Sequence, residues 1–376
     1  MRGARVKIFS AALLMIGCSG NSHAPAQDRD IANLLEDVHV TAHPVTPDFS
    51  LISANQAAAS CPDGDAFVPP QQLRLDAASL DLGTETAVDT ALASAVTYVG
   101  GWHLTTNEPN FGGLSGLDIL EDGNLLAVSD AGAFIHIGMT QEAPNGDGAI
   151  SYMLGADGKL LDGKRASDAE GLHVDFGLAA VSFERDHRIA LFNLEDCGAL
   201  ARGVPVSGRS QITTNTAPET NGLPEDLPDN SGLEALTFID GNFLSGIEAS
   251  NRTGTPLYRP SLFGNQFSLA GSLNTPRGLK LTGLDTVGTD TYALFRRYLP
   301  IFGNTIEVRR YRTLDDEGTV LIRLERPLTV DNFEGIAAKQ MPNGTARLFI
   351  ISDDNFSGDQ RTLLLAFDVL AKSAPN

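Results

Sequence analysis

Acidic residues recur at a regular spacing along the C-terminal three quarters of the sequence. Glu170 lies 14 positions before Glu184, and Glu234 lies 14 positions before Glu248. Carboxylates that gather in one place repel one another, so they need a cation, neighbouring arginines or raised pKa values. Calcium is a hard cation that binds oxygen ligands. We therefore expect calcium to be held by a set of acidic side chains, namely Asp130, Glu170, Glu234, Glu248, Glu334 and Asp353.

The acidic pairs belong to a longer repeat that occurs five times. Each copy starts with a polar residue, a small residue and an aliphatic residue, and the polar residues are Ser115, Glu170, Glu234, Thr282 and Glu334. A recurring hairpin of this size is typical of propeller blades, whose innermost strands line a common axis. That geometry would bring one acidic set to a single opening: Asp130, Glu170, Glu184, Glu234, Glu248, Glu334 and Asp353. The alternatives are solvated turn residues and hydrogen-bond acceptors between blades.

Basic residues follow the same repeat. We expect four arginines near the opening to bind an anionic substrate, namely Arg185, Arg188, Arg296 and Arg361. We expect Glu170, Glu184 and Glu334 to be catalytic, with His187 as a group that could move a proton. The competing interpretation is that the arginines form salt bridges between blades and that His187 is structural.

The pattern of short apolar runs predicts an all-β fold made of antiparallel hairpins. Asp122-Gly123, Asp240-Gly241 and Asn343-Gly344 separate consecutive runs and are typical hairpin turns. The run 96–104 is predicted to be an outer strand that joins the last blade and removes an exposed edge. The number of hairpins does not decide between a propeller of five blades and one of six.

The N-terminus predicts export. Arg2, Arg5 and Lys7 precede an apolar run that ends at Gly17 and Cys18. This order is typical of a lipoprotein signal peptide, with simple secretion or retention of the signal as alternatives. We expect a signal peptide at 1–17, a lipid on Cys18, a flexible tether at 18–90 and the propeller at 91–372. The expected location is the cell envelope, anchored at the outer membrane and facing the periplasm, or the secreted fraction.

Charge and cysteine content limit the partners. The formal charge is −20, with 27 basic and 47 acidic residues, which argues against a nucleic acid. We expect a monomer that acts on a small anionic or ester substrate and meets the membrane only through its lipid. Cys61 and Cys197 form either a disulfide or two thiols, and their spacing does not decide between them.

Several segments resemble the phytase-like family, also described as esterase-like activity of phytase. They include Phe111 to Asp118, Asp168 to Leu172, Val181 to Arg185, and Asn332 to Ile336 with Ile351 to Phe356. The resemblance covers residues 111 to about 370. It implies a propeller of six blades on an exported bacterial protein that hydrolyses phosphate or carboxylic esters. The resemblance does not assign established catalytic residues to positions of this sequence.

Three functions fit these observations. The first is a calcium-assisted hydrolase of phosphate or other esters at the acidic opening. The second is a non-catalytic ligand-binding envelope protein, and the third is a metal-dependent hydrolase similar to propeller lactonases. The sequence contains no Gly-x-Ser-x-Gly motif, which argues against an α/β-hydrolase esterase.

Overall fold

The computed structural model describes residues 58–61, 67–140, 143–207, 222–224, 227–248, 254–261 and 266–370. The predicted signal peptide, Cys18 and most of the predicted tether lie outside these residues. None of the helices in the described ranges is both long and apolar enough to cross a bilayer.

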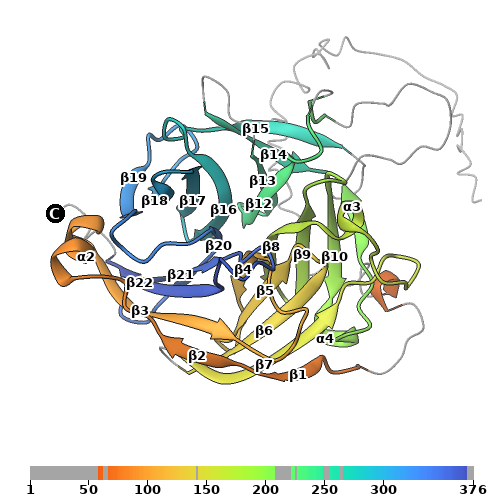
Figure 1. Cartoon of the computed structure of the whole chain (residues 1–376). Helices are drawn as coiled ribbons and strands as arrows, with labels where there is room; N and C mark the ends of the chain where they lie inside the picture. The colour runs from red at the N-terminus through yellow and green to blue at the C-terminus, as the bar shows by residue number, and fades with distance from the viewer. Residues whose placement is uncertain are drawn as a thin grey trace, which may run out of the picture. The chain divides into compact units, whose positions relative to one another are not determined.

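Strands form five antiparallel sheets arranged as blades around one axis (Figure 1). The innermost strands are β4 (Leu114–Ile119), β8 (Ala169–Asp175), β12 (Leu233–Ile239), β16 (Lys280–Val287) and β20 (Phe333–Gln340). Each contacts the innermost strand of the next blade, and β20 contacts β4 to close the ring. The all-β propeller is confirmed, and its blade count matches the five-bladed alternative rather than the six blades that the resemblance implied.

The other strands complete each blade outward from the axis. Blade 1 adds β5 (Leu125–Ser129), β6 (Ala133–Met139), β7 (Pro144–Tyr152) and β1 (Gln71–Arg74). Blade 2 adds β9 (Leu178–Phe183), β10 (Arg188–Asn193) and β11 (Val204–Ser207). Blade 3 adds β13 (Asn242–Ile247), β14 (Thr255–Pro260) and β15 (Phe267–Leu273). Blade 4 adds β17 (Asp290–Leu299), β18 (Gly303–Tyr311) and β19 (Thr319–Leu324).

Blade 5 joins the two ends of the folded region. Its order from the axis is β20, β21 (Ala346–Ser352), β22 (Leu363–Val369), β3 (Val96–Thr105) and β2 (Asp76–Ser79). Trp102 of β3 pairs with Leu364 of β22, so the predicted strand at 96–104 does join the last blade. This pairing covers an edge of β22 that would otherwise be exposed.

The folded region begins earlier than residue 91. Strands β1 and β2 pair with β7 and β3, and helix α2 (Glu85–Ala91) packs beside β19. The expectation of a flexible tether up to residue 90 is therefore wrong for residues 71–90. The sequence there reads as polar because these short edge strands are mostly exposed, with Leu75 and Leu82 as the buried anchors.

Glycine lets neighbouring blades approach closely at the axis. A Cβ on Gly171 of β8 would lie 2.7 Å from the backbone nitrogen of Leu236 in blade 3. A Cβ on Gly283 of β16 would lie 2.7 Å from the carbonyl oxygen of Glu334 in blade 5. Aliphatic side chains fill the axis, where the remaining cavity is about 10 Å³. The axis is thus a packed core without room for a ligand.

A disulfide connects an early segment to blade 2. Cys61 and Cys197 are bonded, with Cα atoms 5.8 Å apart, and Cys197 ends the short helix α4 (Leu194–Cys197). The neighbouring Ser60 hydroxyl donates to the carbonyl of Arg202 at 2.9 Å and accepts from the backbone of Asn193 at 3.0 Å. Of the two states that the sequence left open, the structure contains the disulfide.

Candidate functional site

An acidic cavity of about 280 Å³ opens at one end of the propeller axis. We call it the mouth. Its lining includes all seven acidic residues that the repeat predicted, together with Arg185 and Arg296. The remaining lining residues are Ser115, Lys164, Asp168, Asn230, Lys280 and Asn355. The structure thus places side chains that are up to 240 positions apart, from Ser115 to Asn355, around one cavity.

A β-bulge aims the first polar residue of each repeat. The pairing of every innermost strand shifts register at that residue, for example between Leu233 and Ala235 around Glu234, and between Phe333 and Gly335 around Glu334. The same shift occurs at Ser115, Glu170 and Thr282. A bulge leaves one residue outside the ladder and redirects its side chain. Here it turns the polar residue toward the mouth without breaking the strand.

A repeated backbone hydrogen bond fixes the second acidic residue of each repeat. The amide of Glu184 donates to the carbonyl of Asp168 at 2.9 Å, two positions before Glu170. The amide of Glu248 donates to Gly232 at 3.2 Å, again two positions before the leading residue. Asp130 and Asp353 make the equivalent bonds, to Gly113 and Asn332. The hairpin therefore returns its partner residue to the same rim.

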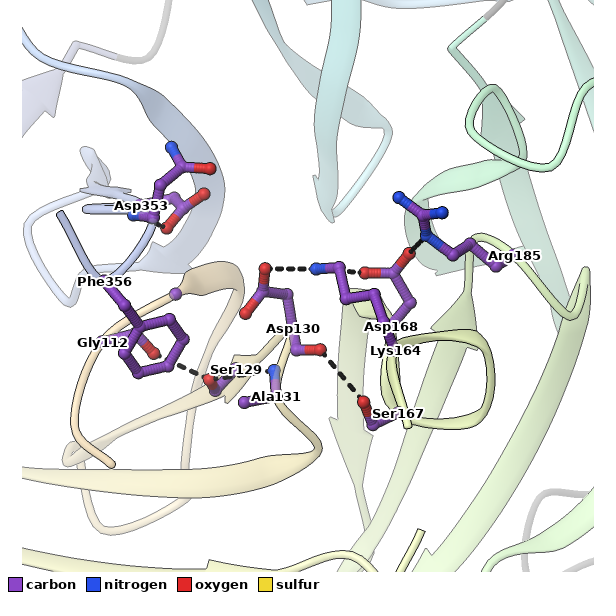
Figure 2. Close-up of polar contacts among 12 residues, drawn as sticks. Gly112, Ser129, Asp130, Ala131, Lys164, Ser167, Asp168, Arg185, Asp353 and Phe356 are labelled. Carbon is purple, nitrogen blue, oxygen red and sulfur yellow. Dashed lines mark hydrogen bonds and ion pairs between the residues drawn. The ribbon is translucent and has the colours of Figure 1, made fainter. Parts of the chain in front are cut away.

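Lysine and arginine neutralise one side of the mouth. Lys164 of the short helix α3 (Lys164–Ser167) lies between Asp130 and Asp168, and Arg185 contacts the other oxygen of Asp168 (Figure 2). The Lys164 Nζ to Asp168 Oδ1 distance is 2.6 Å, and the Arg185 Nε to Asp168 Oδ2 distance is 2.7 Å. Burial opposes the charge of Lys164, but its bonds to both carboxylates outweigh burial and raise its pKa. These contacts hold blades 1 and 2 together at the rim.

The opposite side carries two further ion pairs. Arg296 Nη2 lies 3.1 Å from Glu334 Oε1, and the Asn332 amide also donates to Glu334 at 2.9 Å. Lys280 Nζ lies 2.7 Å from Glu248 Oε2. Both cations belong to blade 4, the blade whose repeat starts with a threonine instead of a glutamate. Blade 4 therefore supplies positive charge to carboxylates of blades 3 and 5.

Three glutamates at the centre have no cation within ion-pairing distance among the described residues: Glu170, Glu184 and Glu234. Burial and the neighbouring carboxylates raise the pKa of Glu170 and Glu234 well above the usual range. Burial also raises the pKa of Glu184 to about 7, although a hydrogen bond shared with Glu234 lowers it in part. We call these residues the central glutamates. Around neutral pH they hold protons or require a cation.

The central glutamates and their neighbours can hold a metal ion. Ligand oxygens of Asp168, Glu170 and Glu184 lie within 4.8 Å of one another, and so do those of Glu184, Glu234 and Glu248. Glu184 belongs to both groups. All five ligand groups are carboxylates, which are the donors that hard divalent cations prefer. The donor chemistry and the raised pKa values therefore fit a bound cation.

Three residues that the sequence placed at the opening lie elsewhere. His187 is 1% exposed and packs against the backbone of Gly232, behind the rim. It adopts a positive φ of 41° in the turn after β9 and does not line the mouth. Arg188 lies 3.7 Å over the ring of Phe183 and bonds Asp186, on the side of blade 2. The expectations that His187 and Arg188 line the mouth are wrong.

Arg361 also lies outside the mouth. It lines a larger adjoining cleft and bonds Asp331, with 3.2 Å between Nε and Oδ2. Conversely, sequence reasoning missed Lys164, Asp168 and Lys280. Asp168 carried a usable signal, because it precedes Glu170 by the same two positions by which Asn332 precedes Glu334. The two lysines carried no such signal. Lys164 lies in the short helix α3 and Lys280 at the start of β16, both outside the repeat's polar positions.

The fold and site define a five-bladed propeller with a carboxylate-lined mouth. The chain belongs to the phytase-like family, described as esterase-like activity of phytase, whose model matches residues 109–356. This confirms the resemblance seen in the sequence. No curated protein matches the chain.

Solved structures with similar folds include several enzymes. A PQQ-bound aldose sugar dehydrogenase from Streptomyces coelicolor is 13% identical over 74% of this chain and 100% of its own, with a TM-score of 0.41. A glutaminyl cyclase from Myxococcus xanthus is 14% identical over 73% of this chain and 97% of its own, with a TM-score of 0.40. Similarities this low carry no information about activity.

Proposed function

We propose that this protein is a calcium-assisted hydrolase of phosphate esters, and that the mouth is its active site. The observation that carries the proposal is the position of Glu184, which belongs to both carboxylate groups and lies among glutamates without a cation. Clusters of groups with perturbed pKa values inside a cavity are typical of active sites. Membership of the phytase-like family supports ester hydrolysis.

The residues that would hold calcium are Asp168, Glu170, Glu184, Glu234 and Glu248. When bound, the cation would polarise a phosphoryl oxygen and lower the pKa of a water molecule. The chain's own residues do the remaining work. Glu184 belongs to both carboxylate groups and would keep the cation in contact with the substrate. Glu334 is fixed by Arg296 and Asn332 and serves to orient the substrate.

Rim cations would bind the anionic substrate. The side chains of Lys164 and Arg185 are 48% and 38% exposed, so they combine an ion pair in the site with access to solvent. Arginine donates in a planar fork that suits phosphate oxygens. These two residues would position the ester and stabilise charge that develops on its oxygens.

A non-catalytic binding protein is the second candidate. The observation that favours it is that Lys164, Arg185, Lys280 and Arg296 all pair with carboxylates already. Such a protein would bind calcium tightly and release no product. A lactonase-like hydrolase would use the same cavity with a neutral substrate, and the substrate panel below separates it from a phosphoesterase.

We also propose that the protein is exported and held at the cell envelope by a lipid on Cys18. The Cys61–Cys197 disulfide supports this, because disulfides persist in oxidising compartments. Metabolic labelling with a fatty acid tests the anchor. Label is expected on the wild-type chain and not on Cys18→Ser, and equal labelling of both would overturn the anchor.

The test of the enzyme is a substrate panel. The mature protein would be assayed with phytate, p-nitrophenyl phosphate, p-nitrophenyl acetate and a γ-lactone, in calcium or in EDTA. We expect phosphate release that requires calcium and that falls at least about 100-fold in Glu170→Gln and in Glu334→Gln, with unchanged circular dichroism. Calcium binding without turnover would select the binding protein, and turnover of the lactone alone would select the lactonase.

A further inference from the structure

A hairpin projects at the mouth end of blade 4, where Arg296 lines the mouth. Strands β17 and β18 stay paired as far as Leu299 and Gly303. The ladder with β16 ends earlier, at Arg296, and the ladder with β19 ends at Ile306. Three residue pairs of the hairpin therefore extend beyond both neighbouring ladders of the blade. At about 3.3 Å per residue, this extension is roughly 10 Å long. We call residues 298–302, at its end, the apolar tip.

A tight turn closes the apolar tip. The amide of Phe302 donates to the carbonyl of Leu299 at 3.0 Å. Pro300 occupies the second position of this turn, which its fixed φ favours, and Gly303 follows with a positive φ of 77°. Pro300 has no backbone N–H and the amide of Phe302 is already bonded, so the turn presents few unpaired donors. Such a turn can enter an apolar phase at a lower cost than an open loop, because unpaired backbone groups are costly there.

Every side chain of the apolar tip is exposed. The exposed fractions of its apolar residues are 59% for Tyr298, 37% for Leu299, 82% for Ile301 and 68% for Phe302, and Pro300 is exposed as well. Five such residues in succession form a patch of roughly 400 Å². A stable protein–protein interface buries roughly 800 Å² on each partner, so the apolar tip alone is too small to hold one. Aromatic rings beside aliphatic side chains are typical of segments at the boundary between lipid headgroups and acyl chains.

Two arginines lie at the base of the apolar tip. A Cβ on Gly278, in the segment before β16, would lie 3.7 Å from Nη1 of Arg297. A Cβ on Gly303 would lie 3.1 Å from Nε of Arg326, which is exposed. Within the described ranges, neither guanidinium has a carboxylate at ion-pair distance. In a chain whose formal charge is −20, this local positive charge beside an apolar patch is complementary to anionic lipid headgroups.

We propose that the apolar tip inserts into the surface of a lipid bilayer, with Arg297 and Arg326 bound to anionic headgroups. The dimensions agree, because interfacial segments bury their apolar face about 5–10 Å deep and the hairpin projects roughly 10 Å. Arg296 lies two positions before Tyr298 and lines the mouth, so insertion turns the mouth towards the membrane surface. The proposal depends neither on a lipid at Cys18 nor on catalysis in the mouth.

Vesicle binding tests the apolar tip in a chain that carries no lipid. The mature chain with Cys18→Ser would be sedimented with vesicles of phosphatidylglycerol and phosphatidylcholine in equal parts. EDTA is present, so that calcium cannot bridge the acidic protein to the anionic lipid. We expect this chain to bind, and the further change Ile301→Asp to weaken binding at least about tenfold. Leu269→Asp is the matched control and should bind as before, because Leu269 is 65% exposed on β15 of blade 3.

Arg326→Ala tests the contact with headgroups. We expect it to weaken binding about fivefold on the mixed vesicles and less than about twofold on phosphatidylcholine alone, because only phosphatidylglycerol adds negative charge to the surface. Arg259→Ala makes the same charge change at an exposed position of β14 and should leave binding unchanged. Equal losses in the two variants would remove Arg326 from the membrane contact.

A fluorescent probe tests insertion directly. Phe302→Trp adds a second tryptophan to a chain that has one, Trp102. Its emission is expected to shift to the blue when vesicles are added, because the ring passes from water into the interface. Leu269→Trp is expected to show no shift. An unshifted spectrum for Phe302→Trp with vesicles in excess would contradict insertion.

The outcomes distinguish the apolar tip from the proposed enzyme. Absence of vesicle binding by the unlipidated chain, or equal losses in Ile301→Asp and Leu269→Asp, would overturn the proposal. A dimer in gel filtration that Ile301→Asp disperses, without any vesicle binding, would assign the apolar tip to a second copy of this chain and would also overturn it. Ile301→Asp should release phosphate from soluble substrates at the wild-type rate, so a failure of the enzyme appears in a different assay.

Discussion

The carboxyl groups of Glu184 and Glu234, from blades 2 and 3, share a hydrogen bond in the mouth. Two carboxylates can form such a bond only when one of them carries the proton. Burial and the repulsion between neighbouring carboxylates raise the pKa values of both groups. The pair therefore keeps a proton at a higher pH than an exposed glutamate would. The pair therefore acts either as a proton store or as a ligand set that gives up its proton to a cation.

Stability without metal should fall as pH rises. Burial raises the pKa of Glu184 to about 7 and that of Asp353 to about 8, whereas both groups titrate near pH 4 in the unfolded chain. The folded protein thus binds more protons than the unfolded chain does. The stability that these two groups contribute is fully present below about pH 4 and is lost as pH rises through 7 to 8. Melting in EDTA should show Tm falling from pH 5.5 to 8.5. A flat or rising Tm would contradict the assignment.

Calcium should reverse that loss at high pH. Deprotonated central glutamates bind the cation, so the gain in Tm from millimolar calcium should be larger at pH 8.5 than at pH 5.5, by about 5 °C or more. Differential scanning fluorimetry with calcium, and with sodium at matched ionic strength, provides the comparison. An equal gain from sodium would indicate simple screening of the acidic surface.

Glu234→Gln should separate metal binding from folding. The amide can still donate a hydrogen bond to Glu184 but removes one buried charge, so the metal-free protein should gain about 1 kcal/mol at pH 8. Its calcium affinity should fall at least about tenfold, as measured by calorimetry. Glu121→Gln, at an exposed turn, is the control and should change neither quantity. A variant that binds calcium normally would remove Glu234 from the ligand set.

Lys164→Met should weaken the rim between blades 1 and 2. The change leaves Asp130 without its lysine and leaves Asp168 with Arg185 alone. Because the lysine side chain is half exposed, we expect a modest loss of about 1 kcal/mol in urea unfolding at pH 7. Lys159→Met removes a lysine whose pair with Asp157 is exposed, and it should cost less than about 0.5 kcal/mol. Equal costs would show that Lys164 only screens charge.

Gly171→Ala should destabilise the contact between blades 2 and 3. The added methyl group would lie 2.7 Å from the Leu236 nitrogen and 2.6 Å from the Ser182 hydroxyl, so the blades must separate. Overpacking of this kind costs about 1–3 kcal/mol. Gly358→Ala, where no atom lies within 4 Å of the added Cβ, should stay within about 0.5 kcal/mol. Denaturant midpoints with unchanged m-values would report the difference.

The repeat made much of the site predictable. Each leading residue and its partner belong to one hairpin, so local pairing alone returns Glu170 and Glu184 to the same rim. The ring then brings the hairpins together, which is why seven acidic residues were correctly grouped. The repeat could not reveal the bulge itself, because a register shift leaves no mark in the order of residue types.

The parts that failed depend on contacts between segments that are far apart in the sequence. Strands β1 and β2 gain their structure from β7 and β3, and as isolated segments they look like the rest of the polar N-terminal region. His187 follows Glu184 by three positions, but its ring packs against Gly232 and does not line the mouth. Lys164 reaches the mouth from the four-residue helix α3 between blades 1 and 2, which is outside the repeat.

The bulge in each innermost strand makes the strand pairing that closes the ring independent of the side chain that faces the mouth. Because the bulged residue makes no ladder bonds, its identity can change while the pairing on both sides persists, as the serine of β4 and the threonine of β16 already show. A redesigned protein could thus exchange the side chains at these five places one at a time. The same scaffold would then present a new arrangement of charge, with its assembly unaltered.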